Sequence, residues 1–445
     1  MKWMFPLTAG LLFAVGVGID LPAAVELPVP GQAKLLSGDE AKKLVLEDFI
    51  RFDPHYSENR ERLGNRLDSL GQQLAKLQAA GNQMECSSEI YSEAQWLRHY
   101  TADWPRLERR LVDLAKSLDQ PDQDFAAHQS SETGLWGACY EEPFFKLEAT
   151  VLALVELAEM DQAPEFAIRL PKPFDARATA VEHFRDLLVS DIAHKGVDNR
   201  GELGNISTVA SLTHFKEYLQ DYLNTKVVGL PRNEGGPGAQ TRAYRDEFRR
   251  YVREWQDPDS GYWGPWYSSQ GRLYKANDLS FTFHIVSYLG GLVDHWPEII
   301  MTTLAIENEP YPFGWKHEGD LTNHNNYDVV KVFRHGWPHM TPEQRRRAAD
   351  AIKYMLDWTL TSSLQPNGSF KTIPTFFSSV GADYYFGVLF LRTIGFWGDP
   401  AKRFWTHENF PESGAICERI KAQLVSMGLK SHEPNDALAA LKHSC

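Results

Sequence analysis

Residues 314–333 read GWKHEGDLTNHNNYDVVKVF and contain, in order, a glycine with a bulky residue behind it, a polar loop and an apolar run. The same order recurs along the chain, since a glycine closely followed by a bulky residue also stands at positions 134, 201, 261 and 368. These glycines are between 53 and 67 residues apart. A period of about 55 residues accommodates two helices of about 12–18 residues with their turns. The pattern therefore predicts a series of helical hairpins.

The predicted helices alternate in polarity. The apolar runs are Phe144–Leu157, Leu279–Leu292, Val329–Phe333 and Tyr384–Phe396, and the more polar segments between them include Gln240–Trp255 and Thr341–Leu360. In a closed ring of hairpins the apolar helix lies inside and the polar helix outside. We therefore expect an all-α fold in which the hairpins form an α/α toroid over residues 125–400. The alternative is an unrelated set of hairpins whose turns contain glycine because turns favour it.

A helical N-terminal region is expected over residues 39–124. Leucines at 63, 67, 70, 74 and 77 form an amphipathic stripe within residues 59–80. A second helical stretch follows from Ile90 to Leu114, and Pro105 should kink or restart it. The polar loop Asp119–Asp124 is a plausible domain boundary, and residues 401–445 are expected to form a helical tail.

The first 24 residues resemble a secretory signal, with a basic residue, an apolar run from Met4 to Gly18 and the small-residue stretch Pro22–Ala24. Residues 25–38 then form a linker. The interpretation favours a secreted or periplasmic protein whose mature chain has no stable membrane insertion, and an uncleaved membrane anchor is the alternative. Of the 445 residues, 46 are Lys or Arg and 59 are Asp or Glu, which gives a net charge of −13. This balance argues against nucleic acid as the main partner.

Four cysteines stand far apart at positions 86, 139, 417 and 445 and form no Cys-x-x-Cys pair, which argues against a zinc knuckle or a redox motif. Of the three complete pairings, one that joins Cys86 to Cys139 is the first expectation. Free, buried thiols are the alternative.

The chain resembles the α/α-toroid enzymes over about residues 125–400. The phrase Pro366–Phe370, followed by Gly381 and the pair Tyr384-Tyr385, is similar to a stretch of the toroidal chondroitin- and hyaluronate-type lyases. The resemblance implies a polysaccharide substrate and a tyrosine base, although Lys371 and Thr372 stand where those lyases commonly have a histidine. The turn Gly261-Tyr262-Trp263 is similar to terpenoid cyclases and protein prenyltransferases, but the Asp-rich motifs of the cyclases are missing because the chain has no Asp-Asp pair.

The richest cluster of chemically active side chains is residues 315–328, between a turn and an apolar helix. Helix N-termini at the mouth of a toroid would bring such side chains together and favour anionic groups. Elimination in a uronate chain requires a neutralised carboxylate, a base and an acid. The predicted catalytic residues are His317, His324, Asn326, Tyr327, Asp278 and Tyr385. The alternative is that the Asn and Asp residues only cap helices.

Substrate binding is predicted for rigid aromatic rings and for nearby polar groups. Rings in loops offer flat faces to sugars. The predicted binding residues are Trp263, Trp266, Lys275, Asn277, Trp315 and Asn325. Of the two neighbouring tryptophans, Trp263 is expected to have a packing role and Trp266 to be exposed.

Hydrolysis is the rival mechanism, because two carboxyl groups about 5–10 Å apart cleave glycosidic bonds. Asp278, Asp320, Asp328 and Asp383 are the candidates. The pair His324 and Asp328 has a metal-ligand spacing, but with no His-Glu-x-x-His motif we expect neither a metal nor another cofactor. The expected function is a carbohydrate-active enzyme that cleaves a polysaccharide. A non-catalytic glycan-binding or scaffold protein and a terpenoid-cyclase-like toroid protein are the alternatives.

Overall fold

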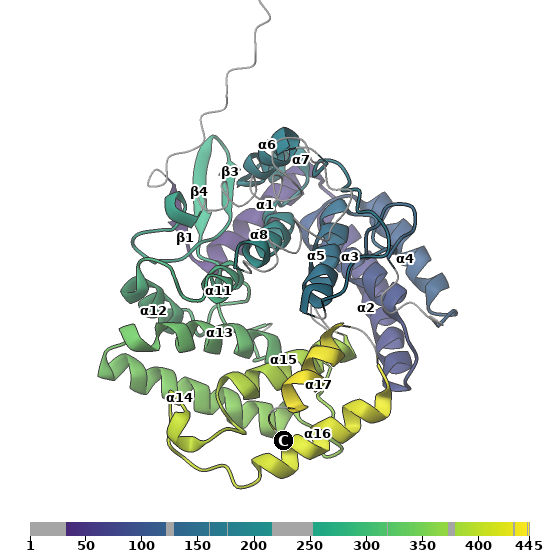
Figure 1. Cartoon of the computed structure of the whole chain (residues 1–445). Coiled ribbons are helices and arrows are strands. Elements are labelled where there is room, and N and C mark those ends of the chain that lie inside the picture. Colours follow the sequence, from purple (N-terminus) through teal and green to yellow (C-terminus); the bar gives the residue numbers. More distant parts are fainter. Residues whose placement is uncertain are drawn as a thin grey trace, which may run out of the picture.

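The protein is mostly helical and carries one small sheet (Figure 1). The computed structural model describes residues 33–121, 129–159, 161–175, 177–215, 252–317, 319–372, 379–429, 432–442 and 444. The predicted leader lies outside these residues, as do Glu318, Cys445 and most of the predicted helix 240–255. Among the described residues, no helix combines the length and the apolar character needed to cross a membrane.

The N-terminal region contains four helices: α1 (Gly38–Phe52), α2 (Tyr56–Ala79), α3 (Glu85–Tyr100) and α4 (Trp104–Ser117). The leucine stripe explains the second of these, since Leu63, Leu67, Leu70 and Leu74 are buried on one face of α2. The predicted restart at Pro105 is confirmed, because α3 ends at Tyr100 and α4 begins with this proline in its first turn. Helix α3 packs against both α2 and α4.

Six further helices follow one another through direct packing. Each of them contacts the next, in the order α5 (Pro143–Glu159), α8 (Arg200–Phe215), α11 (Leu279–Tyr288), α13 (Asn323–Gly336), α15 (Val380–Thr393) and α17 (His432–Lys442). Figure 1 shows these six helices around the middle of the molecule. The four predicted apolar runs lie in α5, α11, α13 and α15, so the apolar pattern located these helices correctly.

Other helices lie on the outer side of this set (Figure 1). They are α6 (Arg177–Leu187), the single turn α7 (Ile192–Lys195), α12 (Trp296–Ala305), α14 (Pro342–Trp358) and α16 (Ser413–Met427). Helix α14 is the predicted polar segment, and it begins with a capping box between Thr341 and Gln344. Short η helices follow α13 (Trp337–His339), α14 (Thr359–Ser363) and α15 (Pro400–Lys402).

A four-stranded sheet departs from the all-α expectation. Its strands are β1 (Lys34–Leu36), β2 (Val189–Ser190), β3 (Trp266–Ser269) and β4 (Arg272–Ala276), in the spatial order β1-β4-β3-β2. Strands β3 and β4 form an antiparallel hairpin, while β1 and β2 pair with it in parallel. The sheet therefore joins the N-terminal region to segments more than 150 residues further along the chain.

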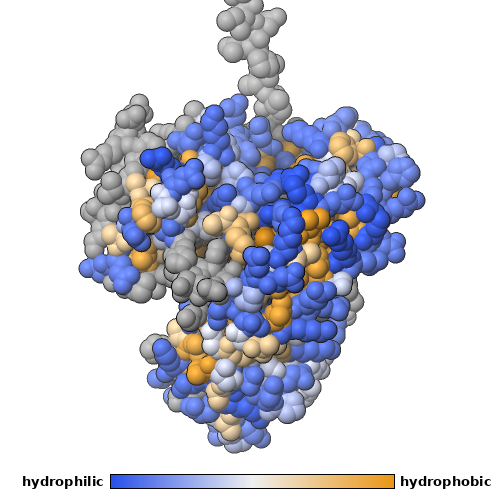
Figure 2. All heavy atoms as spheres, turned by 90° about the vertical axis from the view of Figure 1, so that its right-hand side faces the viewer, coloured by the Kyte–Doolittle hydropathy of each residue, from blue (hydrophilic) through white to orange (hydrophobic). Residues whose placement is uncertain are grey.

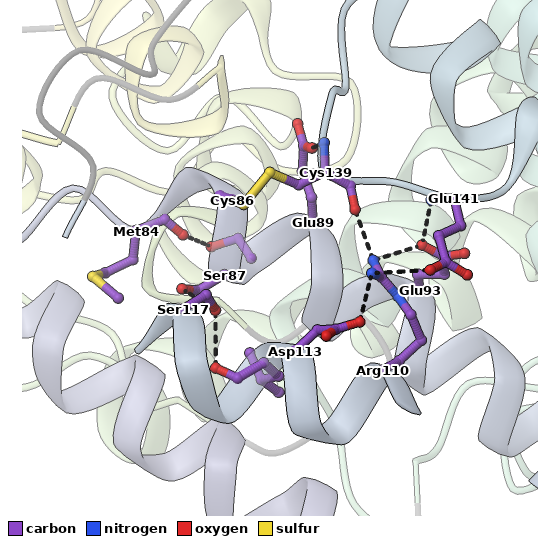
Figure 3. Close-up of a disulfide and its surroundings, with 12 residues drawn as sticks. Met84, Cys86, Ser87, Glu89, Glu93, Arg110, Asp113, Ser117, Cys139 and Glu141 are labelled. Atoms are coloured by element: carbon purple, nitrogen blue, oxygen red, sulfur yellow. Dashed lines mark hydrogen bonds and ion pairs between the residues drawn. A yellow bond between two sulfur atoms is a disulfide. The ribbon is translucent and has the colours of Figure 1, made fainter. Parts of the chain in front are cut away.

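The expected Cys86–Cys139 disulfide is present, and it ties α3 to the loop that precedes α5 (Figure 3). Cys417 is also disulfide-bonded. Beside the first disulfide, the fully buried carboxylate of Glu93 accepts hydrogen bonds from Arg106 and Arg110 and from the backbone N–H groups of residues 141 and 142. These bonds fix the start of α5 against α3 and α4.

The repeated glycines have different roles. Gly134, Gly261 and Gly368 have positive φ angles of 71°, 70° and 91°, which a residue with a side chain rarely adopts. Gly201 lies in the first turn of α8 instead, so the repeat prediction of a turn there is wrong.

Figure 2 shows a mostly hydrophilic outer face with small separate hydrophobic patches.

Candidate functional site

The N-terminal ends of α8, α11 and α13 hold the chemically active side chains of the candidate site. Helix α11 begins where Asp278 accepts a hydrogen bond from the Phe281 N–H at 2.9 Å. Helix α13 begins where Thr322 accepts one from the Asn325 N–H at 3.1 Å. Helix α8 begins with Arg200 itself. Helix α8 packs on α11 and α11 on α13, Arg200 bonds to Asp278, and Asp278 is close enough to Asp328 of α13 to act on its charge.

A buried ion pair joins α8 to α11. The Arg200 Nε donates to Asp278 Oδ2 at 2.5 Å, and its Nη1 donates to the Tyr100 hydroxyl at 2.5 Å. Arg200 is 9% exposed and Asp278 is fully buried. Burial alone would lower the pKa of Arg200, but Asp278 and Tyr100 raise it above its ordinary value. Arg200 therefore keeps its charge, and it places a fixed positive group at the site.

A second carboxyl group in the same site has no cation beside it. Asp328 is fully buried, and its Oδ2 accepts a hydrogen bond from the Tyr311 hydroxyl at 3.3 Å. The His324 Nε2 lies 3.7 Å from the same oxygen. Within the described residues, Asp328 Oδ1 has no hydrogen-bond partner. Burial raises the pKa of Asp328 well above its ordinary value, which favours the protonated form of this carboxyl group.

Two imidazoles of the site are neutral at physiological pH. Burial, reinforced by His284 and His317, lowers the pKa of His324 to about 3. Burial likewise lowers the pKa of His284 to about 4, although its Nδ1 lies 2.7 Å from the Ser280 carbonyl oxygen. The His324 ring packs between Tyr311 and Phe386, with centroid distances of 5.3 Å and 4.3 Å. A neutral imidazole accepts a proton on one nitrogen and donates from the other.

The predicted catalytic residues fall into two groups. His324, Tyr327 and Tyr385 lie together: the Tyr327 and Tyr385 rings are 6.4 Å apart, and Phe386 packs against both His324 and Tyr327. Asp278 belongs to the ion pair described above, and His317 is close enough to His324 to influence its charge. Asn326 is buried, and its Nδ2 donates to Thr359 Oγ1 at 3.4 Å instead of to another predicted catalytic residue. Burial raises the pKa of Tyr385.

The predicted substrate-binding residues are engaged in packing and in structural hydrogen bonds. Trp263, Trp266 and Trp315 are 0%, 3% and 2% exposed, so their ring faces are covered. The expectation that Trp266 is exposed is wrong, because its ring packs against Trp255 at 4.8 Å. Three polar members have structural partners: Lys275 Nζ with Asp257 Oδ1 at 2.6 Å, Asn277 Oδ1 with Ser260 Oγ at 2.8 Å and Asn325 Nδ2 with the Trp315 carbonyl oxygen at 2.7 Å.

Sequence reasoning did not single out Tyr100, Arg200, Tyr311 or His284. No local motif surrounds these residues, and they meet only because the helices and the loop before α13 pack together. Of the other carboxyl candidates, Asp320 is exposed and accepts from the Leu321 N–H. Burial raises the pKa of Asp383 well above its ordinary value, and Thr372 bonds to it.

A metal centre has no support in the part of the chain that the structure describes. No three His, Cys, Asp or Glu side chains there gather as metal ligands, and His324 with Asp328 makes only a pair.

No protein family, no curated protein and no solved structure matches the chain. The interpretation of the site therefore depends on its own residues.

Proposed function

We propose that the six inner helices and their outer partners form an α/α toroid, with the candidate site at one mouth of the ring. The order of packing α5-α8-α11-α13-α15-α17 supports this arrangement, as does the alternation of inner and outer helices from α11 to α17. Hairpins that pack against their neighbours in this way bring together helix ends that are distant in sequence. The N-terminal helices then flank the ring.

The proposed function is cleavage of a polysaccharide by a secreted or periplasmic enzyme. The observation that carries it is the convergence of Arg200, Asp278, Tyr311, His324 and Asp328 at the N-terminal ends of inner helices. Buried groups of opposite protonation state within one site are typical of acid–base catalysis. If these side chains only capped the helices, one polar residue at the start of each helix would be enough.

Elimination in a uronate-containing chain is the favoured mechanism. Neutral His324, or Tyr327 once it has lost its hydroxyl proton, is suited to take the proton beside the substrate carboxylate, and Tyr311 to protonate the leaving oxygen. The substrate carboxylate itself raises the proton affinity of a nearby imidazole, which compensates the low pKa of His324 in the free protein. Arg200 supplies positive charge to the anionic transition state.

Hydrolysis is the second candidate, and the contrast between two carboxyl groups favours it. Asp328 is buried without a cation and is suited to donate a proton to the leaving oxygen, whereas Asp278 is ion-paired with Arg200. One protonated and one ionised carboxyl group are what glycoside hydrolysis requires.

The test is an assay of the purified protein on uronate polymers and on neutral glucans. Elimination produces unsaturated product ends that absorb in the ultraviolet, whereas hydrolysis produces reducing ends without this absorbance. His324→Ala should lower turnover at least about 100-fold, while His194→Ala, whose side chain is 82% exposed, should leave it unchanged. Reducing ends alone from either polymer would establish hydrolysis. Failure to cleave any glycan, or full activity of His324→Ala, would overturn the proposal.

A further inference from the structure

The face of α13 that begins at the candidate site continues into a group of basic side chains. His324, Tyr327, Lys331 and Arg334 follow one another at intervals of three or four residues, so they lie along one face of the helix. From His324 to Arg334 this face extends about 15 Å along the helix axis. We call Lys331, Arg334 and Arg392 the basic cluster, where Arg392 comes from the last turn of α15.

The members of the basic cluster are close to one another. Lys331 Nζ lies 5.4 Å from the centre of the Tyr327 ring, which links the cluster to the candidate site. Arg334 Nη1 donates to the Thr393 carbonyl oxygen at 3.1 Å, so it bridges the ends of α13 and α15. Burial lowers the pKa of Lys331, and the positive charges of Arg334 and Arg392 lower it further.

Helix dipoles explain only part of this arrangement. Arg334 and Arg392 stand in the last turns of their helices, where a positive charge is favourable. Lys331 stands before the last turn of α13 and is half-buried, so it gains little from the dipole and loses hydration. Within the described residues, no carboxylate forms an ion pair with any of the three. In a chain with a net charge of −13, three unpaired cations at one place favour an anionic ligand.

We propose that the basic cluster binds an oxyanion, namely the carboxylate or sulfate group of an anionic glycan that extends along α13 from the candidate site. The nature of the ligand rests on the proposed function, whereas the anion site itself does not. Arg334 and Arg392 are exposed and reach solvent, and half-buried Lys331 beside Tyr327 defines the inner end of the site. Arginine binds carboxylate and sulfate oxygens through two N–H groups at once, and lysine adds a point charge.

The test measures equilibrium binding by titration calorimetry, with oligogalacturonate, inorganic sulfate and neutral dextran oligosaccharide as probes. Oligogalacturonate should bind and dextran should not, and added salt should weaken binding. Lys331→Met and Arg392→Gln should each weaken oligogalacturonate binding about tenfold. Arg346→Gln on α14, whose side chain is 68% exposed, is the matched control and should bind as the wild type does.

The variants separate this inference from the proposed function. His324→Ala should bind oligogalacturonate as the wild type does although it cleaves nothing, which supports both the anion site and the catalytic proposal. Binding without turnover by the wild type supports the anion site and contradicts only the catalytic proposal. Binding of sulfate but not of oligogalacturonate would overturn the glycan as the ligand. Equal binding by the wild type, Arg392→Gln and Lys331→Met, with circular dichroism unchanged, would overturn the basic cluster as the site.

Discussion

Glu148 is a carboxylic acid on the inner helix α5 whose partner is the Asn205 side chain of α8. Burial raises its pKa from 4.5 to about 7, so the folded state favours the protonated form. The stability that this gives is complete below pH 4.5 and is lost as the pH rises through about 7. The full shift corresponds to about 3 kcal/mol, and partial exposure of the side chain reduces this to about 1–2 kcal/mol.

Glu148→Gln removes this titration and keeps an amide that bonds to Asn205. We expect the variant to unfold at a higher urea concentration than the wild type at pH 8 and at a similar concentration at pH 4.5. Urea titrations at the two pH values measure the difference. An equal difference at both values would show that the ionisation of Glu148 has no part in stability.

Glu93 is a second buried acidic residue whose substitution should have a large effect on stability, and its role is structural. It accepts from Arg106 and Arg110 and from two backbone N–H groups, so its loss leaves the 4% exposed Arg110 without its buried counterion. Glu93→Gln should lower the free energy of unfolding by about 3 kcal/mol. The surface pair of Arg62 and Glu108 provides the control, and Glu108→Gln should cost less than about 1 kcal/mol. Equal, small losses in urea denaturation would contradict this.

At the scale of elements, the disulfide and the Glu93 network act on the same loop (Figure 3). Cys86 and Cys139 are 53 residues apart, and closing a loop of this length removes about 4 kcal/mol of chain entropy from the unfolded state. Replacing both cysteines by serine should therefore lower the free energy of unfolding by about 2–4 kcal/mol. Thermal unfolding of the variant measures the loss, and an unchanged midpoint would mean that the Glu93 network alone holds the loop.

The helices and the sheet differ in how well their own sequences predict their secondary structure. Helix α2 was predictable because five leucines repeat at helical spacing, and four of the five are buried. The sheet was not, because β2 has two residues and β1 three, which is too short for an alternating pattern. Trp266 illustrates the same limit: a ring in a Gly- and Pro-rich segment is typical of an exposed loop, yet β3 places it between Trp255 and the neighbouring strands.

At the scale of the whole molecule, the candidate site was predictable only in part. The loop before α13 drew attention to His324 and Tyr327 because it holds more polar groups than one helix cap needs. Arg200 and Tyr100 are 100 residues apart, and no periodicity within either segment relates them. Their meeting depends on how α3 and α8 pack, which is tertiary information.

The N-terminal helices are integrated with the rest of the protein. Strand β1 pairs with β4, the Gly38 N–H donates to Glu309 at 2.8 Å, and the Tyr100 hydroxyl accepts from the buried Arg200. A chain that begins at residue 129 would leave Arg200 without one partner and β4 without one of its two neighbouring strands, so we expect it not to fold. For the whole protein we expect a single cooperative unfolding transition by circular dichroism and by tryptophan fluorescence. Two separate transitions, or a soluble folded chain from residue 129, would indicate two independent domains. If the transitions coincide, Tyr100 and Arg200 belong to one cooperative unit, and the N-terminal helices are a structural part of the site.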